Sequence, residues 1–349
     1  MTGFLLLDDG TVFPGRSVGA LGIAFGEAVF TTAMTGYQEI VTDPSYAEQL
    51  VCFTAPMIGN YGVSPRRSES TACHARAVLM RRATGVDWSR WLAGQGVVAL
   101  EEIDTRALVL RLRSGGAQRA AVVAGHAPVE EVLEQVRAQP SMEGRALAAE
   151  VSTREPYSLG RGRPRIAVLD YGCKRSILTR LSVCGAQATV YPHDSDCETI
   201  LEGSPDGVLL SNGPGDPAVL TEEIGVVREL LGRVPILGIC LGHHLLALAA
   251  GFETFKLQFG HRGANHPVLE LASSRVLVTS QNHGFAVHGD GPEVTHVSLY
   301  DGTVEGISLR GQHACSVQFH PEAGPGPHDA WPLIEAWVEE LRGADAQAA

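Results

Sequence analysis

One cysteine stands at a predicted strand-to-helix junction, in a pattern that suits nucleophilic chemistry. Cys240 follows the apolar run 234–239 and precedes residues 241–250, which are apolar at helical spacing. Gly238 and Gly242 bracket it as Gly-x-Cys-x-Gly, and residues without side chains permit the strained turn that exposes a nucleophile. Because free amides at the start of a helix favour an anion, the sequence predicts a reactive thiolate at Cys240.

A histidine and a glutamate further along the chain favour this interpretation over a cysteine that merely packs in the core. Residues 314–322 form a strand-like run that ends in His320 and Glu322. Residues two apart on an extended chain point to the same side, so Glu322 can orient the imidazole while His320 faces a third group. Cys240, His320 and Glu322 are therefore predicted to act as nucleophile, base and orienting carboxylate.

Alternating strands and helices after residue 165 predict the sheet that must position these groups. The predicted strands are 166–169, 189–191, 207–210 and 236–239, and the predicted helices are 175–183, 222–231 and the helix after the cysteine. This alternation implies an α/β fold with a mostly parallel sheet and helices on both faces, in which ligands bind at the carboxyl ends of strands. Cys240 and the Gly-Pro-Gly turn at 213–215 both follow such ends.

The chain divides by composition into two domains and a linker. Residues 1–150 predict a mixed α/β domain whose topology does not follow from the sequence. Its predicted strands include 4–7 and 28–32, and its helices include 88–92, 129–136 and one through Leu108 that Asp104 or Thr105 caps. Residues 151–165, rich in Pro, Gly, Ser and Arg, predict a linker, and residues 166–342 form the second domain.

Composition disfavours several classes of function. The 349 residues carry 39 acids against 27 bases, a formal charge of −12, which disfavours a nucleic-acid-binding face. Seven scattered cysteines form neither a disulfide framework nor a Cys-x-x-Cys metal pair. The N-terminus lacks the pattern of a secretory signal, and no apolar run reaches the roughly 20 residues that span a bilayer. We expect a cytoplasmic protein without membrane contact.

The motifs around Cys240 and His320 resemble those of class I, triad-type glutamine amidotransferases, and the resemblance implies glutamine hydrolysis. Over residues 4–341 the chain also resembles the small, glutamine-hydrolysing subunit of carbamoyl-phosphate synthetase. The segments that carry this narrower resemblance are TGYQEIVTDPSY at 35–46, IGNYG at 58–62, IDTR at 103–106, SNGPGDP at 211–217, FGHRGANHPV at 259–268, SQNHGFA at 280–286 and PGPHD at 325–329. The implied second domain is the class I glutamine amidotransferase fold.

Further site residues follow from position and from the resemblance. The amides of Gly213 and Leu241 lie where they can hold the oxyanion formed by attack on an amide, and the resemblance implies the same pair. The resemblance also implies that glutamine is held by six other positions, of which Asn282, Gly284 and Phe285 lie in a predicted polar loop, 281–286. The remaining three are Gly215, His244 and, in the N-terminal domain, Ser45.

His244 departs from the family pattern, which usually continues Cys-x-Gly-His-Gln with the glutamine side chain in contact with substrate. One helical turn past Cys240, it should share that residue's face. An imidazole can donate or accept a hydrogen bond but changes charge near neutral pH. We expect an altered KM for glutamine that His244→Gln changes. His261 and His266, in a predicted glycine-containing loop, lack further ligands nearby, so no metal site is predicted.

The resemblance implies a partner and leaves two alternatives. Ammonia would pass to a separate large synthetase subunit, in a heterodimer or higher oligomer, which uses bicarbonate and MgATP to make carbamoyl phosphate for arginine and pyrimidine synthesis. The glutaminase step needs no cofactor, and the chain has no Gly-x-x-x-x-Gly-Lys-Ser/Thr phosphate loop. The alternatives are an amidotransferase for another synthase, which residues 1–150 disfavour, and a catalytically impaired regulatory or scaffold subunit. Weak activity is expected without the partner.

Overall fold

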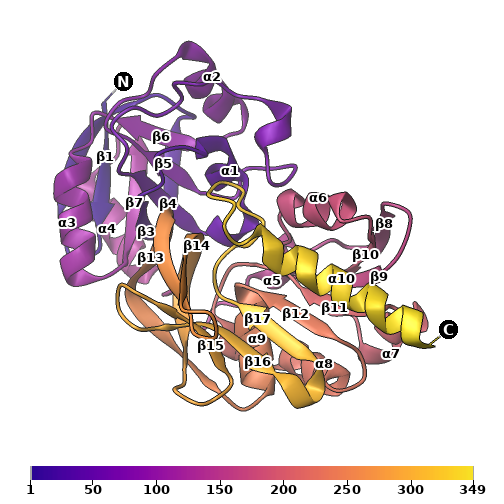
Figure 1. Ribbon diagram of the computed structural model, residues 1–349. Helices are drawn as coiled ribbons and strands as arrows, with labels where there is room; N and C mark the ends of the chain where they lie inside the picture. The colour runs from indigo at the N-terminus through magenta and orange to yellow at the C-terminus, as the bar shows by residue number, and fades with distance from the viewer. Residues whose placement is uncertain (1, 349) are drawn as a thin grey trace. The chain divides into compact units, whose positions relative to one another are not determined.

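The computed structural model describes residues 2–348 and contains two compact units (Figure 1). The first unit runs as far as Glu143 and also includes Gln258–Gly263, and the second consists of Gly144–Leu257 and the chain from Ala264. The first division therefore falls seven residues before the predicted boundary at 150, and the short return of the chain to the first unit was not predicted. Among the described residues, no helix has the length and apolar character needed to cross a membrane.

The first unit is built on a closed barrel with the strand order β1-β2-β6-β5-β4-β3-β7. The strands are β1 (Thr2–Leu7), β2 (Val12–Ser17), β3 (Gly22–Thr31), β4 (Gln49–Phe53), β5 (Ala77–Leu79), β6 (Val98–Glu101) and β7 (Gln118–Ala124). Strands β3 to β6 pair in parallel, and the other pairs are antiparallel. Alternate residues such as Leu5, Leu7 and Leu100 are buried in one apolar cluster, as the period of two in a strand requires.

Helices and short turns complete the first unit. They are α1 (Tyr37–Thr42), η1 (Pro44–Tyr46), η2 (Pro65–Arg67), α2 (Val86–Gly94), α3 (Thr105–Gly115) and α4 (Val129–Ala138). The predicted cap of α3 is confirmed for Asp104, whose Oδ1 accepts a hydrogen bond from the Ala107 amide at 3.0 Å. The predicted strand at 28–32 covers the end of the longer strand β3, which stops at Thr31. The first half of β3, GIAFGE, is interrupted by glycines and shows no clear period of two.

The second unit contains one sheet with the strand order β14-β13-β15-β16-β17-β12-β11-β9-β10-β8. The strands are β8 (Tyr157–Leu159), β9 (Arg165–Asp170), β10 (Gln187–Pro192), β11 (Gly207–Leu210), β12 (Ile236–Ile239), β13 (Glu253–Glu270), β14 (Arg275–His288), β15 (Val294–Ser298), β16 (Val304–Leu309) and β17 (Ala314–Val317). The predicted parallel arrangement holds for β10, β9, β11, β12 and β17, while β8 and the β13–β16 part pair antiparallel.

Helices cover both faces of the parallel strands. The helices are α5 (Ala148–Val151), α6 (Arg175–Val183), α7 (Cys197–Glu202), α8 (Thr221–Leu230), α9 (Leu241–Ala249) and α10 (Trp331–Ala348), with η3 (Pro217–Val219) and η4 (Arg310–Gln312). Val208 and Leu210 are buried in one apolar cluster with residues of α8 and α9. Leu209 between them is buried in a second cluster with residues of α6 and α10. The two-sided burial explains why these strands read as continuous apolar runs.

Three predictions about irregular segments are wrong. The predicted linker 151–165 contains the edge strand β8 and belongs to the second unit. The predicted polar loop 281–286 lies inside β14, and the predicted loop with His261 and His266 lies inside β13. Polar residues that are buried within these strands hide the alternation by which a strand is normally recognised.

Candidate active site

The chain turns sharply at Cys240, between the end of β12 and the start of α9. Cys240 has φ 54° and ψ −102°, a combination that costs a side-chain-bearing residue of order 1–3 kcal/mol and is found where function requires it. Its amide donates to the Val317 carbonyl at 3.0 Å, which ties the elbow to β17. Cys240 precedes the first amide of α9, as the sequence predicts, but its side chain is buried and not exposed.

The two glycines of the motif are required by close backbone approaches. A Cβ on Gly238 would lie 2.6 Å from the Gly242 carbonyl oxygen, and a Cβ on Gly242 would overlap the Leu210 carbonyl oxygen. The Gly242 amide also donates to the Ser211 carbonyl at 3.0 Å, which joins α9 to the chain after β11. Absence of a side chain at 238 therefore lets β12 approach the start of α9, and its absence at 242 lets α9 pack against β11.

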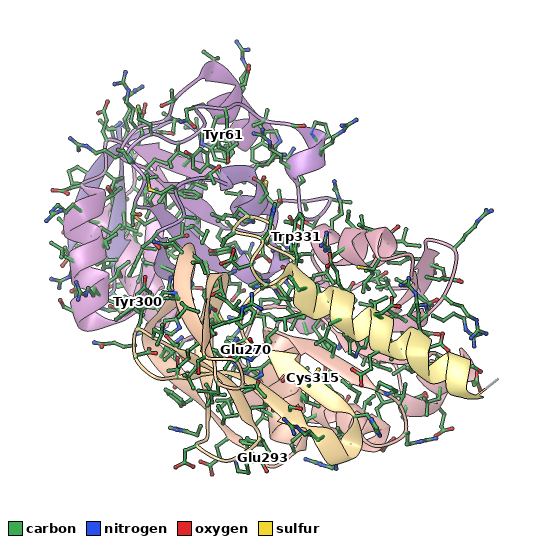
Figure 2. All side chains as sticks on the ribbon, viewed as in Figure 1. Tyr61, Glu270, Glu293, Tyr300, Cys315 and Trp331 are labelled. Carbon is green, nitrogen blue, oxygen red and sulfur yellow. The ribbon has the colours of Figure 1, made fainter. Side chains whose placement is uncertain are left out.

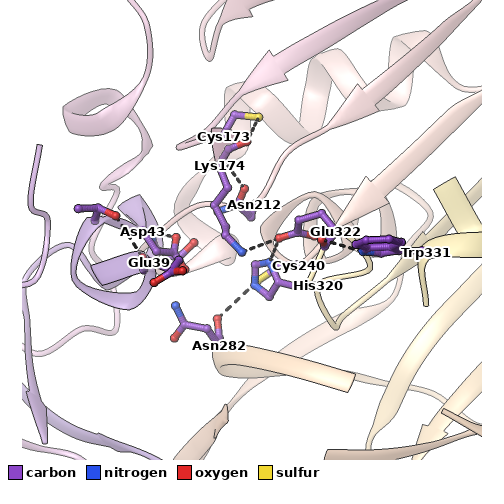
Figure 3. A network of polar contacts seen from close by, with 12 residues as sticks. Glu39, Asp43, Cys173, Lys174, Asn212, Cys240, Asn282, His320, Glu322 and Trp331 are labelled. Atoms are coloured by element: carbon purple, nitrogen blue, oxygen red, sulfur yellow. Dashed lines mark hydrogen bonds and ion pairs between the residues drawn. The ribbon is translucent and has the colours of Figure 1, made fainter. Parts of the chain in front are cut away.

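His320 and Glu322 meet as predicted, although not on an extended strand. Strand β17 ends at Val317, and both residues lie in the turn that follows. His320 Nδ1 is 2.7 Å from Glu322 Oε1. The other ring nitrogen, Nε2, forms no hydrogen bond to an oxygen or nitrogen among the described residues. Nε2 is therefore available to the Cys240 thiol, whose interaction with the imidazole raises the pKa of His320. Figure 3 shows the three side chains together.

Lys174 is a member of this group that the sequence did not indicate. Its Nζ lies 2.7 Å from Glu322 Oε1, the same oxygen atom that His320 uses, and both side chains of this ion pair are almost completely buried. The Lys174 amide donates to Asn212 Oδ1 at 3.1 Å, and Lys174 caps α6 just after the carboxyl end of β9 (Figure 3). That position at a strand end was the one available signal, since catalytic sites of such sheets gather there.

The turn that holds Glu322 is anchored to α10. The indole Nε1 of Trp331, at the start of this helix (Figure 2), donates to the Glu322 carbonyl oxygen at 3.1 Å. The Arg180 guanidinium of α6 lies over the Trp331 ring, 3.8 Å from its centroid, in a cation–π contact. The backbone of the carboxylate residue is therefore fixed from the side opposite to Lys174.

Burial and the neighbouring side chains set the pKa values of His320 and Glu322. Burial alone would lower the pKa of His320, but the Glu322 carboxylate and the Cys240 thiol outweigh burial and the repulsion from Lys174, and raise it to about 10. Burial would raise the pKa of Glu322, yet Lys174 and His320 hold it well below its usual range. At neutral pH the pair is thus an imidazolium beside a carboxylate, the arrangement that stabilises a nearby thiolate.

The structure places the two residues that carry the predicted oxyanion donors, Gly213 and Leu241, next to each other. A Cβ on Gly213 would lie 2.8 Å from Leu241 Cδ2, so the Gly-Pro-Gly turn is packed against the first residue of α9. Leu241 opens that helix, and an amide in this position has no acceptor within the helix. Gly215 in the same turn has φ 96°, and a Cβ there would lie 2.5 Å from the Arg145 carbonyl oxygen.

The predicted glutamine contacts fall into two groups. Asn282, Gly284 and Phe285 lie on β14, and the Asn282 carbonyl oxygen is 3.6 Å from Cys240 Sγ. Ser45 belongs to the first unit, where it lies in η1 and its amide donates to Asp43 Oδ1 at 2.9 Å. Asn282 is thus beside the nucleophile, and the glutamine-binding roles of all four residues stay predictions.

His244 lies on α9, buried one turn after Cys240 as predicted, and the expectation about its charge is wrong. Its Nε2 is 3.2 Å from the Phe285 carbonyl oxygen. Burial lowers the pKa of His244 to about 4, against smaller raising effects from this carbonyl, Gln318 and Asp216. The imidazole of His244 is therefore neutral throughout the physiological pH range.

His266, the second histidine of the predicted loop, packs edge-on against Tyr300 with ring centroids 5.1 Å apart.

Comparison with known proteins agrees with this geometry. The family model described as "Glutamine amidotransferase class-I" matches residues 167–339, and "Carbamoyl-phosphate synthase small chain, CPSase domain" matches residues 5–122. Proteins named "Carbamoyl phosphate synthase small chain" from Salmonella typhimurium and Escherichia coli K12 are each 44% identical over 366 residues, covering 96% of both chains. The protein of that name from Thioalkalivibrio sulfidiphilus is 45% identical over 366 residues and covers 97% of both. The chain belongs to the carbamoyl-phosphate synthase small chain family.

Proposed function

We propose that this protein hydrolyses L-glutamine at Cys240 and delivers the ammonia to a large synthetase subunit. The proposal is carried by one observation, a buried group of four side chains: Cys240 at its glycine-bracketed elbow, His320, Glu322 and Lys174. The chain that holds this group belongs to the carbamoyl-phosphate synthase small chain family. The partner would combine ammonia with bicarbonate, using MgATP, to form carbamoyl phosphate. The two subunits would form a heterodimer or a higher oligomer.

The first half of the reaction forms a thioester. The Cys240 thiolate attacks the side-chain carbonyl carbon of glutamine, and the oxyanion accepts hydrogen bonds from the Leu241 and Gly213 amides. The His320 imidazolium then donates its Nε2 proton to the amide nitrogen. The carbon–nitrogen bond breaks, ammonia leaves, and the glutamyl group stays bound to sulfur while His320 becomes neutral.

The second half releases glutamate. Neutral His320 removes a proton from water through Nε2, and the resulting hydroxide attacks the thioester carbonyl. The carbon–sulfur bond breaks, glutamate leaves, and the thiolate and imidazolium are restored. Glu322 stabilises the imidazolium and fixes the ring through Nδ1, 2.7 Å from its Oε1.

The substrate contacts follow from position and from the family resemblance. We propose that Asn282, Gly284 and Phe285 on β14, Gly215 in the turn after β11 and Ser45 in η1 hold the amino-acid end of glutamine. The seven cysteines are free thiols, which supports a reducing, cytoplasmic location. This half-reaction uses no metal and no nucleotide.

The direct test compares glutamate release by the wild-type protein and Cys240→Ser, with and without a large subunit. Because the thiolate forms the covalent bond, the variant should lose at least about 1,000-fold in kcat. Wild-type turnover should be weak alone and rise with the partner. Folding is checked by circular dichroism. A folded wild type that releases no glutamate in either condition would instead favour the regulatory or scaffold role.

A further inference from the structure

We propose that His244 is a positioning residue, which fixes the Phe285 carbonyl and through it the part of β14 that binds glutamine. This inference rests on the proposed function, because it concerns how the glutamine site is held. It assigns His244 a role different from that of the glutamine side chain usual at this position, which contacts the substrate directly. The contacts of His244 and of the Phe285 carbonyl all lie within the second unit.

Two histidines bind the same carbonyl oxygen. The Phe285 oxygen is 3.2 Å from His244 Nε2 and 2.6 Å from His283 Nδ1. A carbonyl oxygen only accepts hydrogen bonds and has two lone pairs, so both ring nitrogens must carry a proton. This fixes the tautomers as Nε2–H for His244 and Nδ1–H for His283.

The rest of the surroundings keeps the His244 ring in place. His244 is 3% exposed and its ring is inclined at 62° to that of His283, with centroids 6.5 Å apart. The side chain of Gln318 is fully buried and its interaction with the imidazole raises the pKa of His244. Neither polar atom of Gln318 has another hydrogen-bond partner among the described residues. The ring of His244 is therefore held by protein groups, the Phe285 carbonyl and the Gln318 side chain.

The Phe285 carbonyl is a point from which substrate geometry can be controlled. Phe285 lies three residues after Asn282, whose own carbonyl is 3.6 Å from the Cys240 sulfur. Both ends of residues 282–285 thus depend on the first turns of α9, at Cys240 and at His244. Loss of the bond at 244 leaves the Phe285 carbonyl held by His283 of the same strand but removes its link to α9, which should disturb glutamine binding more than the chemistry at sulfur.

The test compares His244→Ala, His244→Asn and His244→Gln in the complex with the large subunit, with KM and kcat measured separately. Loss of the hydrogen bond should raise the KM for glutamine about 10-fold or more in the alanine variant, with kcat within about 3-fold. The asparagine amide is too short to replace Nε2, whereas the glutamine amide reaches that position. We expect His244→Asn to resemble alanine and His244→Gln to stay within about 3-fold of wild type. This replaces the expectation from the sequence that His244→Gln changes the KM, because the glutamine amide keeps the hydrogen bond to the Phe285 carbonyl oxygen.

A second readout needs no activity. In glutamine-free protein, hydrogen exchange at residues 282–287 should become faster in His244→Ala and return toward wild type in His244→Gln. The matched control is His243→Ala, because His243 is equally buried on the same helix but its Nδ1 contacts Ser316 Oγ, at 2.8 Å, instead of β14. It should leave exchange at 282–287 and the KM unchanged, even if the protein is less stable.

The outcomes separate the alternatives. A KM change in His244→Ala without faster exchange, or a His244→Gln variant with KM shifted more than about 10-fold, would mean that residue 244 contacts glutamine directly and would overturn the proposal. If exchange at residues 282–287 is also faster in the control His243→Ala, the change reflects general destabilisation, and the proposal is overturned. If wild-type protein proves inactive, the proposed function fails, while exchange still reports on the positioning contact.

Discussion

At the scale of single residues, one oxygen atom of Glu322 controls the charge of the site. Its Oε1 binds both His320 and Lys174 at 2.7 Å. Glu322 raises the pKa of His320, whereas Lys174 lowers it. The two neighbours of the imidazole therefore act in opposite directions on the proton that it must give to the leaving nitrogen, and substitutions can separate them.

Glu322→Gln should shift the alkaline limb of the activity profile to lower pH. The wild-type imidazolium keeps its proton up to a pKa of about 10 because the carboxylate stabilises it. A neutral amide removes most of that stabilisation, so the proton is lost earlier and the limb in kcat/KM against pH should fall by at least about one pH unit. The control is Glu335→Gln, which removes a half-exposed carboxylate paired with Arg180 and should leave the limb unchanged.

Lys174→Met should shift the alkaline limb of kcat/KM against pH in the opposite direction. Without the ammonium, the pKa of His320 should rise, so the alkaline limb should move to higher pH or leave the measured range. Removal of one partner of a buried pair should also lower the free energy of unfolding by about 3 kcal/mol, measured by urea denaturation. Movement of the limb in the same direction for both variants would contradict this account of the charges.

At the scale of elements, the elbow depends on how closely α9 approaches β11. A Cβ on Gly242 would overlap the Leu210 carbonyl oxygen, and the obstacle is backbone that cannot rotate away. The same glycine lies two residues after the nucleophile. Displacement of α9 would therefore change both the stability of the second unit and the position of the Leu241 amide, the proposed oxyanion donor.

Gly242→Ala should lower the free energy of unfolding by about 2 kcal/mol, the typical cost of overpacking, and reduce kcat more than KM. The matched control is Gly225→Ala in the middle of α8, where a Cβ would meet nothing within 4 Å. Alanine is the better helix former, so this control should stabilise the protein by about 0.5–1 kcal/mol. Equal effects of the two substitutions would refute the packing explanation.

At the scale of the whole molecule, one strand contributes to both units. Residues Gln258–Gly263 of β13 are part of the first unit, where the Thr32 amide donates to the Arg262 carbonyl at 3.1 Å and the Phe259 ring stacks on Phe30 at 5.9 Å. Phe255, the third residue of β13, stacks on His288 of the second unit with ring centroids 4.1 Å apart. Two phenylalanines on one strand thus stabilise different units.

Phe259→Ala should destabilise the first unit selectively, by about 1–2 kcal/mol for the lost aromatic contact. Hydrogen exchange resolved by segment should show faster opening of β3 and β7, with β14 close to wild type. Phe255→Ala is the matched control and should show the reverse, with β14 opening faster. If both variants open the same segments, the two units unfold as one cooperative body and the division into units has no thermodynamic meaning.

The sequence by itself determined the elements whose signals are local. The elbow at Cys240, the pair His320 and Glu322, and the apolar strands with their intervening helices follow from spacing within a few residues, and the structure places them as predicted. Such features are encoded by backbone freedom at glycine and by the periods of helix and strand, which do not depend on distant contacts.

Tertiary structure alone decided which distant residues meet. Lys174 and Glu322 are 148 residues apart, and the order of the barrel strands, the return of Gln258–Gly263 to the first unit and the neutral state of His244 all depend on burial by remote segments. Residues 281–286 of β14 and the part of β13 with His261 and His266 were predicted to be loops for the same reason. Burial sets both the cost of a charge and the partner that compensates it, and no spacing along the chain records either.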